Sequence, residues 1–158
     1  MDRPILLSSV RNFRDFGGHQ TESGKRVVTG QLFRSAHYGD VTDEDRARLE
    51  ALGVKFLVDL RHADERERAP NKWAPARVLT QADGGEHVAA VEVGARDAAA
   101  RGRMNMIEAY AYIPYGRRFT ALFGDFFRTL ADEGGPVIIH CAIGKDRTGI
   151  LSALLLSA

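Results

Sequence analysis

The sequence predicts an α/β fold with a mainly parallel sheet flanked by helices. Three observations support this class: short segments of strand composition alternate with helical segments, one helical segment is strongly amphipathic, and another begins at a clear capping residue. With 158 residues, the chain is expected to form one domain that buries its own core. Its 44% hydrophobic and 27% charged residues are typical of a globular domain in water.

Four short segments are rich in aliphatic residues, and most are bounded by turn residues, as strands are. They are residues 30–35, 54–60, 78–81 and 137–139. Between the first two, Thr42 has the residue type of a helix N-cap and is followed by acidic residues in the first turn. We expect this helix to run to Leu52, with Gly53 as its C-cap.

Residues 117–131 predict an amphipathic helix, because their large apolar side chains recur three and four positions apart. These side chains are Phe119, Leu122, Phe123, Phe126, Phe127 and Leu130. We interpret the stripe as core packing rather than a ligand site. Residues 92–102 show no clear period and are interpreted as a mobile segment or a weak helix, and the charged run 64–68 as a solvated face.

The most informative segment for function is residues 136–149, in which an apolar strand ends at His140 and at Cys141, the only cysteine. Residues 149–156 are apolar and predict a helix, so the connecting loop lies between a strand's carboxyl end and a helix's amino end. Backbone N–H groups at such a helix start are unsatisfied, and the helix dipole favours an anion. The loop is therefore expected to bind a phosphoryl group.

The residue types in this loop suit nucleophilic chemistry on phosphorus. Gly144 allows a turn that a side chain would oppose, and Arg147 presents a planar fork that matches two phosphate oxygens. The positive field is expected to lower the pKa of Cys141 from ~8.5 into the range of about 3.5–7.5. A thiolate can then attack phosphorus to form a phosphocysteine, and Thr148 can hydrogen-bond the sulfur as it leaves.

The pattern His-Cys-x-x-Gly-x-x-Arg-Thr resembles the signature of cysteine-dependent protein tyrosine phosphatases. In full, residues 140–149 read HCAIGKDRTG, which is similar to an atypical bacterial branch. That branch includes secreted phosphatases of mycobacterial and listerial pathogens that act on phosphotyrosine and phosphoinositides. Three further landmarks match in the same order: NFRDFGG at 12–18, LFRSA at 32–36 and VDLR at 58–61. Four ordered matches are far more specific than one.

The resemblance implies a phosphomonoester hydrolase that uses a phosphate loop between its last strand and the following helix. Cys141 is then the nucleophile, and Arg147 stabilises the transition state. The phosphate-binding positions are Ala142, Ile143, Gly144, Lys145, Asp146 and Arg147. Arg34, Ser35, Arg61 and His140 are expected to support the loop. Lys145 either meets a phosphoinositide ring or is solvated.

The general acid has three candidates, because the leaving oxygen needs a proton that a positioned carboxyl usually supplies. Asp146 is preferred, since it lies within the signature, where the lookalike branch holds its own aspartate. Asp83 is a rival that follows a strand candidate and precedes two glycines. Asp59 is either catalytic or a charge-paired residue that orients Arg61 or Arg147.

Two other kinds of loop fit this sequence less well. A nucleotide P-loop needs a hydroxyl residue after its lysine and a glycine where Ile139 stands, and sulfurtransferase loops usually hold one residue fewer. No metal or other cofactor is expected, because one cysteine and five scattered histidines make a poor ligand set. The remaining alternatives are a phosphoinositide or small-molecule phosphatase and a phosphate-binding module without turnover.

The expected partners and location follow from charge and composition. A net charge of +1 makes no case for nucleic acid, so the substrate is a phosphotyrosine or phosphoserine protein or a phosphoinositide. No segment is long enough to span a membrane, and none resembles a cleaved signal peptide. A single cysteine suits the reducing cytoplasm, although export without a cleaved signal stays open. Residues 1–158 are expected to be a single phosphatase domain that lacks C-terminal helices, so a missing segment or a dimer partner would cover the apolar helix 149–156.

Overall fold

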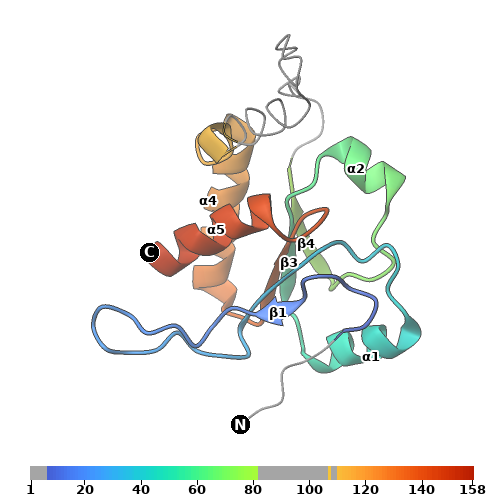
Figure 1. The fold of residues 1–158 in the computed structure, drawn as a ribbon, viewed down its shortest axis with the longest axis horizontal. Coiled ribbons are helices and arrows are strands. Elements are labelled where there is room, and N and C mark those ends of the chain that lie inside the picture. Colours follow the sequence, from blue (N-terminus) through green and yellow to red (C-terminus); the bar gives the residue numbers. More distant parts are fainter. Residues whose placement is uncertain (1–6, 82–106, 108–109) are drawn as a thin grey trace.

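The protein is described by a computed structural model in which residues 7–81, 107 and 110–158 are placed. A five-stranded sheet has the order β1-β2-β5-β3-β4, and its strands are β1 (Arg14–Asp15), β2 (Leu32–Ser35), β3 (Phe56–Asp59), β4 (Arg77–Thr80) and β5 (Val137–His140). The named helices are α1 (Asp43–Ala51), α2 (Ala63–Arg68), α4 (Arg117–Glu133) and α5 (Asp146–Ser157) (Figure 1). Only the pair β1–β2 is antiparallel, so the expected mainly parallel α/β sheet is confirmed.

The register of the central strand brings the functional segments together. β5 lies between β2 and β3, and His140 at its end is paired with Ser35 on one side and with Asp59 on the other. The carboxyl ends of three parallel strands therefore meet at one edge of the sheet. Cys141, which follows His140, is delivered to that edge, where open α/β sheets bind ligands.

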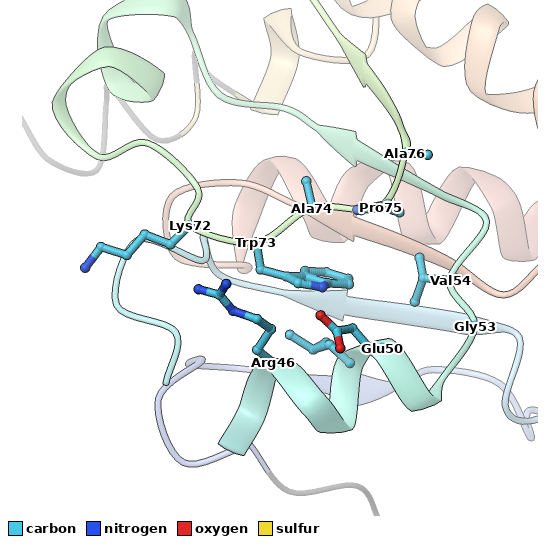
Figure 2. A pocket seen from close by; sticks show the side chains of 10 residues that line it. Arg46, Glu50, Gly53, Val54, Lys72, Trp73, Ala74, Pro75 and Ala76 are labelled. Carbon is cyan, nitrogen blue, oxygen red and sulfur yellow. The ribbon is translucent and has the colours of Figure 1, made fainter. Parts of the chain in front are cut away.

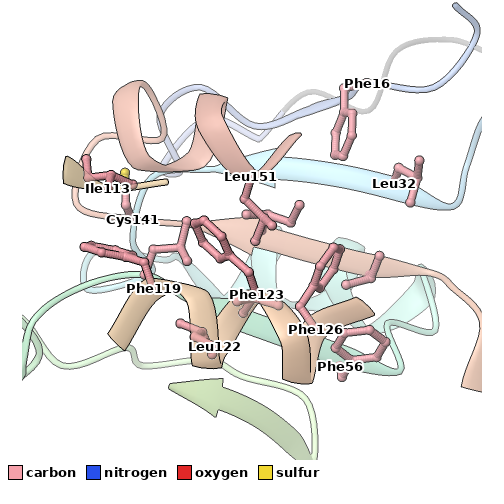
Figure 3. Close-up of a cluster of buried hydrophobic side chains, with 14 residues drawn as sticks. Phe16, Leu32, Phe56, Ile113, Phe119, Leu122, Phe123, Phe126, Cys141 and Leu151 are labelled. Atoms are coloured by element: carbon pink, nitrogen blue, oxygen red, sulfur yellow. The ribbon is translucent and has the colours of Figure 1, made fainter. Parts of the chain in front are cut away.

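Two apolar layers cover the sheet, because successive side chains of a strand point to opposite faces. Val137 and Ile139 of β5 pack in one cluster with the α4 phenylalanines and Leu151 of α5 (Figure 3). Ile138 packs in the other cluster with Leu49 of α1. Figure 1 accordingly shows α4 and α5 on one side of the sheet and α1 on the other.

The expected elements are mostly confirmed, with shorter strands and two corrections. The Thr42 side chain caps α1 by accepting the Asp45 N–H at 3.3 Å, as expected. The C-cap, however, is Leu52, and Gly53 follows it with a φ of 61°, since the left-handed residue comes after the cap. The amphipathic stripe is confirmed as core in α4, whereas residues 92–102 lie outside the described residues.

The last helix begins earlier than expected, at Asp146 rather than Gly149. The Gly149 N–H already donates to the Lys145 carbonyl at 2.8 Å, so the first helical turn includes Asp146 and Arg147. Leu151 is buried in the core, but Leu154 and Leu156 are 38% and 40% exposed. The apolar helix is therefore covered only on one face by the described residues. No helix among these residues has the length and apolarity needed to cross a bilayer.

Candidate active site

Cys141 lies at the junction between the sheet edge and α5. Its side chain is 3% exposed and belongs to the core cluster that also contains Ile113 and Phe119 (Figure 3). The Gly144 N–H donates to the Cys141 Sγ at 3.2 Å, so the loop bends back over the sulfur. A backbone donor that faces the sulfur favours negative charge at this position.

The surroundings of Cys141 favour the thiolate. Burial alone raises the pKa of this thiol, but the Thr148 hydroxyl, the Arg147 charge and the backbone N–H groups of Ile143 and Thr148 together lower it. The buried Thr148 hydroxyl makes no regular hydrogen bond within the described residues. The hydroxyl is therefore available to donate to a charged sulfur.

Gly144 is required by conformation and by space. Its φ is 73°, in the left-handed region. A Cβ at this position would lie 2.3 Å from the Ser35 carbonyl carbon and 2.4 Å from its oxygen. The loop therefore rests directly on the end of β2, which confirms the expectation that Gly144 permits a turn a side chain would oppose.

Two side chains hold the loop from outside. Arg34 Nη2 donates to the carbonyls of Gly144 at 3.0 Å and Lys145 at 2.9 Å, and Asn12 Nδ2 donates to the Ile143 carbonyl at 2.8 Å. Because these carbonyls are bonded away from the sulfur, the N–H groups of the same peptides can face inward. Arg34 was expected to support the loop, and these hydrogen bonds fit that role. The hydrogen bond from Asn12, which belongs to the 12–18 landmark, was not expected.

Arg147 is fixed by a carboxylate that sequence reasoning missed. Its Nη1 and Nη2 donate to the two Glu65 oxygens at 2.5 and 2.7 Å, and Nη1 also donates to the Leu60 carbonyl at 3.1 Å. Burial alone would raise the pKa of Glu65, but its hydrogen bonds to Arg147 and its charge pairing lower it to about 2. The expectation that residues 64–68 form only a solvated face is therefore wrong for Glu65.

The Glu65 pair leaves one edge of the guanidinium for a ligand. An arginine has five N–H donors, and three are used by Glu65 and Leu60. The remaining two, on Nε and Nη2, have no acceptor among the described residues. They lie on one planar edge, the arrangement that binds two phosphate oxygens side by side. The signal for Glu65 was its position three residues after His62, whose N–H it accepts at 2.9 Å.

Asp59 is the centre of a buried charge network behind the loop. Arg61 donates to both of its oxygens from Nε and Nη2, at 2.7 to 3.1 Å, and His140 Nε2 lies 3.4 Å from Oδ2. Burial would raise the pKa of Asp59, but the bonds from His140 and Arg61 hold it well below its usual range. A carboxylate so engaged is a poor proton donor, which favours the charge-pairing interpretation over general-acid catalysis. Asn71 Nδ2, at 3.2 Å from His140 Nε2, extends the network.

Asp146, the preferred general acid, is the first residue of α5, and its side chain is 30% exposed. Its Oδ1 accepts the Tyr110 hydroxyl at 2.5 Å and lies 3.8 Å from Lys145 Nζ. Lys145 is 71% exposed and the Ile143 side chain is 58% exposed, so both lie at the outer rim of the loop. The rival Asp83 lies outside the described residues.

Two further hollows lie on the surface of the described residues. A hollow of about 430 Å³ lies between α1 and residues 72–76, where the Arg46 side chain lies near Trp73 and the Lys72 side chain points away from it (Figure 2). A second hollow, of about 490 Å³, lies between β1 and α5. Neither is lined by Cys141, and no cluster of metal-ligating side chains occurs in these residues.

These features place a buried cysteine and a charge-paired arginine together at the carboxyl edge of a parallel sheet. Comparison with known proteins agrees: a family model described as "Tyrosine phosphatase family" matches residues 5–158, and the chain belongs to that family.

Among curated relatives, the chain is 33% identical to a Cupriavidus necator protein that carries a provisional tyrosine-protein phosphatase name. It is 35% identical to the tyrosine-protein phosphatase of Nostoc commune and 29% identical to the triple specificity protein phosphatase PtpB of Mycobacterium tuberculosis. The three alignments cover 98%, 82% and 96% of this chain, but 57%, 44% and 62% of the relatives. The chain thus spans about half the length of these proteins. The solved structure of P. aeruginosa TpbA is 26% identical, with a TM-score of 0.36 over 82% of this chain and 60% of that chain.

Proposed function

We propose that the protein is a phosphomonoester hydrolase, a protein tyrosine or dual-specificity phosphatase that acts through a phosphocysteine. One observation carries the proposal. The Cys141 sulfur faces the Gly144 N–H at the start of α5, and the adjacent Arg147 has an edge with two donors that Glu65 does not occupy. The proposed site thus combines a nucleophile, an anion cradle and a bidentate oxygen clamp.

In the first step, the Cys141 thiolate attacks phosphorus, and the bond from phosphorus to the leaving oxygen breaks. The loop N–H groups and Arg147 bind the phosphoryl oxygens as negative charge shifts in the transition state. Asp146 gives its proton to the leaving oxygen, so a neutral phenol or alcohol departs. Arg147 retains its charge throughout, because the Glu65 pair raises its already high pKa despite burial.

In the second step, water attacks the phosphocysteine and releases phosphate. Asp146, now ionised, takes a proton from this water, and the bond between sulfur and phosphorus breaks. The Thr148 hydroxyl can donate to the sulfur as it regains negative charge, which makes the thiolate a better leaving group. The proton lost by Asp146 in the first step is thus recovered in the second.

A phosphoinositide or small phosphorylated molecule is the second candidate substrate. The observation in its favour is Lys145, whose side chain is 71% exposed at the rim and could bind a further phosphate of an inositol ring. Phosphotyrosine is preferred because the described residues place only one such cation within the loop, and because the rim includes the exposed apolar side chain of Ile143.

We also propose that residues 1–158 form a single phosphatase domain and that further chain or a second copy covers the outer face of α5. Leu154 and Leu156, which flank the buried side of α5 to left and right, are 38% and 40% exposed, and covering them would remove apolar surface from water. A reducing compartment such as the cytoplasm suits the enzyme, because a low-pKa thiolate is easily oxidised.

The test is hydrolysis of para-nitrophenyl phosphate by the wild type and by Cys141→Ser, in the presence of EDTA. We expect turnover that EDTA does not reduce and that Cys141→Ser abolishes. Turnover that survives in Cys141→Ser would overturn the proposal, and phosphate binding without turnover would identify a binding module. A phosphotyrosine peptide and a vesicle-bound phosphoinositide, compared by kcat/KM, then distinguish the two substrate classes.

A further inference from the structure

Tyr110 contacts Asp146 from a distant part of the chain. Its hydroxyl donates to Asp146 Oδ1 at 2.5 Å across 36 positions of sequence. The side chain of Tyr110 is 45% exposed, so burial of its ring does not explain its position. The hydrogen bond to Asp146 and, to a lesser extent, burial raise the pKa of the Tyr110 hydroxyl. Tyr110 therefore remains protonated and acts as a donor at neutral pH.

We propose that Tyr110 is a positioning residue that fixes Oδ1 of Asp146, so that Oδ2 carries the proton transferred in catalysis. This inference rests on the proposed function, in which Asp146 is the general acid and then the general base.

The bond from Tyr110 is compatible with both forms of Asp146. An ionised carboxylate accepts hydrogen bonds at either oxygen, and a protonated carboxyl still accepts at its carbonyl oxygen. Tyr110 can thus donate to Oδ1 throughout the cycle, while the catalytic proton occupies Oδ2. Lys145 Nζ, at 3.8 Å, also lies on the Oδ1 side, and no described residue bonds to Oδ2. Both contacts therefore leave the same oxygen open to the substrate.

Positioning of this kind has a defined kinetic effect. In the first step the proton moves from Oδ2 to the leaving oxygen, and in the second a proton returns to Oδ2 from the attacking water. Without Tyr110, the carboxyl can rotate and present the wrong oxygen, which lowers the fraction of productive complexes. The loss should grow with the basicity of the leaving oxygen, because a poor leaving group depends most on protonation.

The experiment compares Tyr110→Phe with the wild type on a series of aryl phosphates, from para-nitrophenyl phosphate to unsubstituted phenyl phosphate. The parameter is kcat/KM, which reports phosphocysteine formation rather than hydrolysis. General acid catalysis contributes roughly 10²–10⁴-fold, so we expect loss of its orientation to lower kcat/KM by about tenfold for phenyl phosphate and far less for para-nitrophenyl phosphate. Tyr115→Phe is the matched control, since Tyr115 is 81% exposed, and it should leave the whole series unchanged.

Asp146→Asn separates this inference from the proposed function. If Asp146→Asn shows a steep dependence on the leaving group and Tyr110→Phe does not, the positioning role is wrong while the general acid stands. If Asp146→Asn shows no added dependence, the general-acid assignment fails, and the positioning role fails with it. An equal loss by Tyr110→Phe on every substrate, with a lowered Tm, would identify a purely structural residue and overturn the inference.

Discussion

Glu65→Gln is the substitution that tests most of the site's electrostatics at once. It keeps the size and hydrogen-bonding shape of the side chain but removes the charge that pairs with Arg147 at 2.5 and 2.7 Å. The amide also offers one acceptor where the carboxylate offered two, so the bidentate pair is lost. We expect lower stability and lower turnover, because Arg147 loses both a partner and its fixed orientation.

The magnitude follows from the pKa of Glu65, which is lowered from 4.5 to about 2. At about 1.4 kcal/mol for each pH unit, this corresponds to an upper bound of roughly 3–4 kcal/mol. The side chains of Glu65 and Arg147 are 23% and 18% exposed, so solvent screening reduces the contribution. We expect a loss of about 1–2 kcal/mol in unfolding free energy at pH 7. For a domain of this size, that lowers Tm by roughly 2–8 °C.

The pH dependence of the stability difference between wild type and Glu65→Gln tests this reasoning. Because the pKa of Glu65 is depressed in the folded state, its stabilisation is fully present above the unfolded value of 4.5 and is lost as pH falls toward 2. The difference in unfolding free energy between wild type and Glu65→Gln, measured by urea titration, should therefore shrink from pH 6 to pH 3. A difference that stays constant over this range would show that the carboxylate charge is not what stabilises the pair.

Three further substitutions test the loop and its support. Thr148→Val should raise the pKa of Cys141, so that iodoacetamide alkylation at pH 6 slows while its rate at high pH is retained; an unchanged pH profile would contradict this. Gly144→Ala should lower the unfolding free energy by more than about 1–3 kcal/mol and abolish turnover, because the residue combines a positive φ with a close backbone contact. Gly24→Ala is the control: at a φ of 79° with nothing within 4 Å, it should lose only the stability that backbone strain removes. Equal losses in Tm would refute the role of the contact. Asp59→Asn should destabilise the fold by about 3–5 kcal/mol in urea unfolding, since it leaves a buried guanidinium without its charge partner, and a near-neutral result would show that the network is dispensable.

Local sequence signals predicted the framework of the site well. Apolar segments bounded by turn residues located four of the strands, and their alternation with helices indicated a mainly parallel sheet. The strand order that brings Ser35, Asp59 and His140 to one edge was not predicted. The need for glycine at 144 also followed from local chemistry, because a phosphate loop must turn sharply. These features depend on residues close together in the sequence, where periodicity and turn chemistry are informative.

The contacts that join distant segments could not be predicted in the same way. Glu65 lies 82 positions from Arg147, and the charged run around it has the pattern of an exposed helical face. Tyr110 and Asn12 contact the loop from 36 and 131 positions away. The pairing of such residues depends on how helices and loops pack onto the sheet, and no local pattern encodes that geometry. The start of α5 was missed for a related reason, because a polar first turn has the composition of a loop.

The most direct test of the central claim is to trap the covalent intermediate. Wild-type protein is mixed with para-nitrophenyl phosphate, quenched in acid on the time scale of one turnover, digested and examined by mass spectrometry, with Cys141→Ser treated in parallel. The account predicts one phosphoryl group on the peptide that contains Cys141 in the wild type and no turnover in the variant. Release of para-nitrophenol without phosphorylation of Cys141, or turnover that persists in Cys141→Ser, would contradict it.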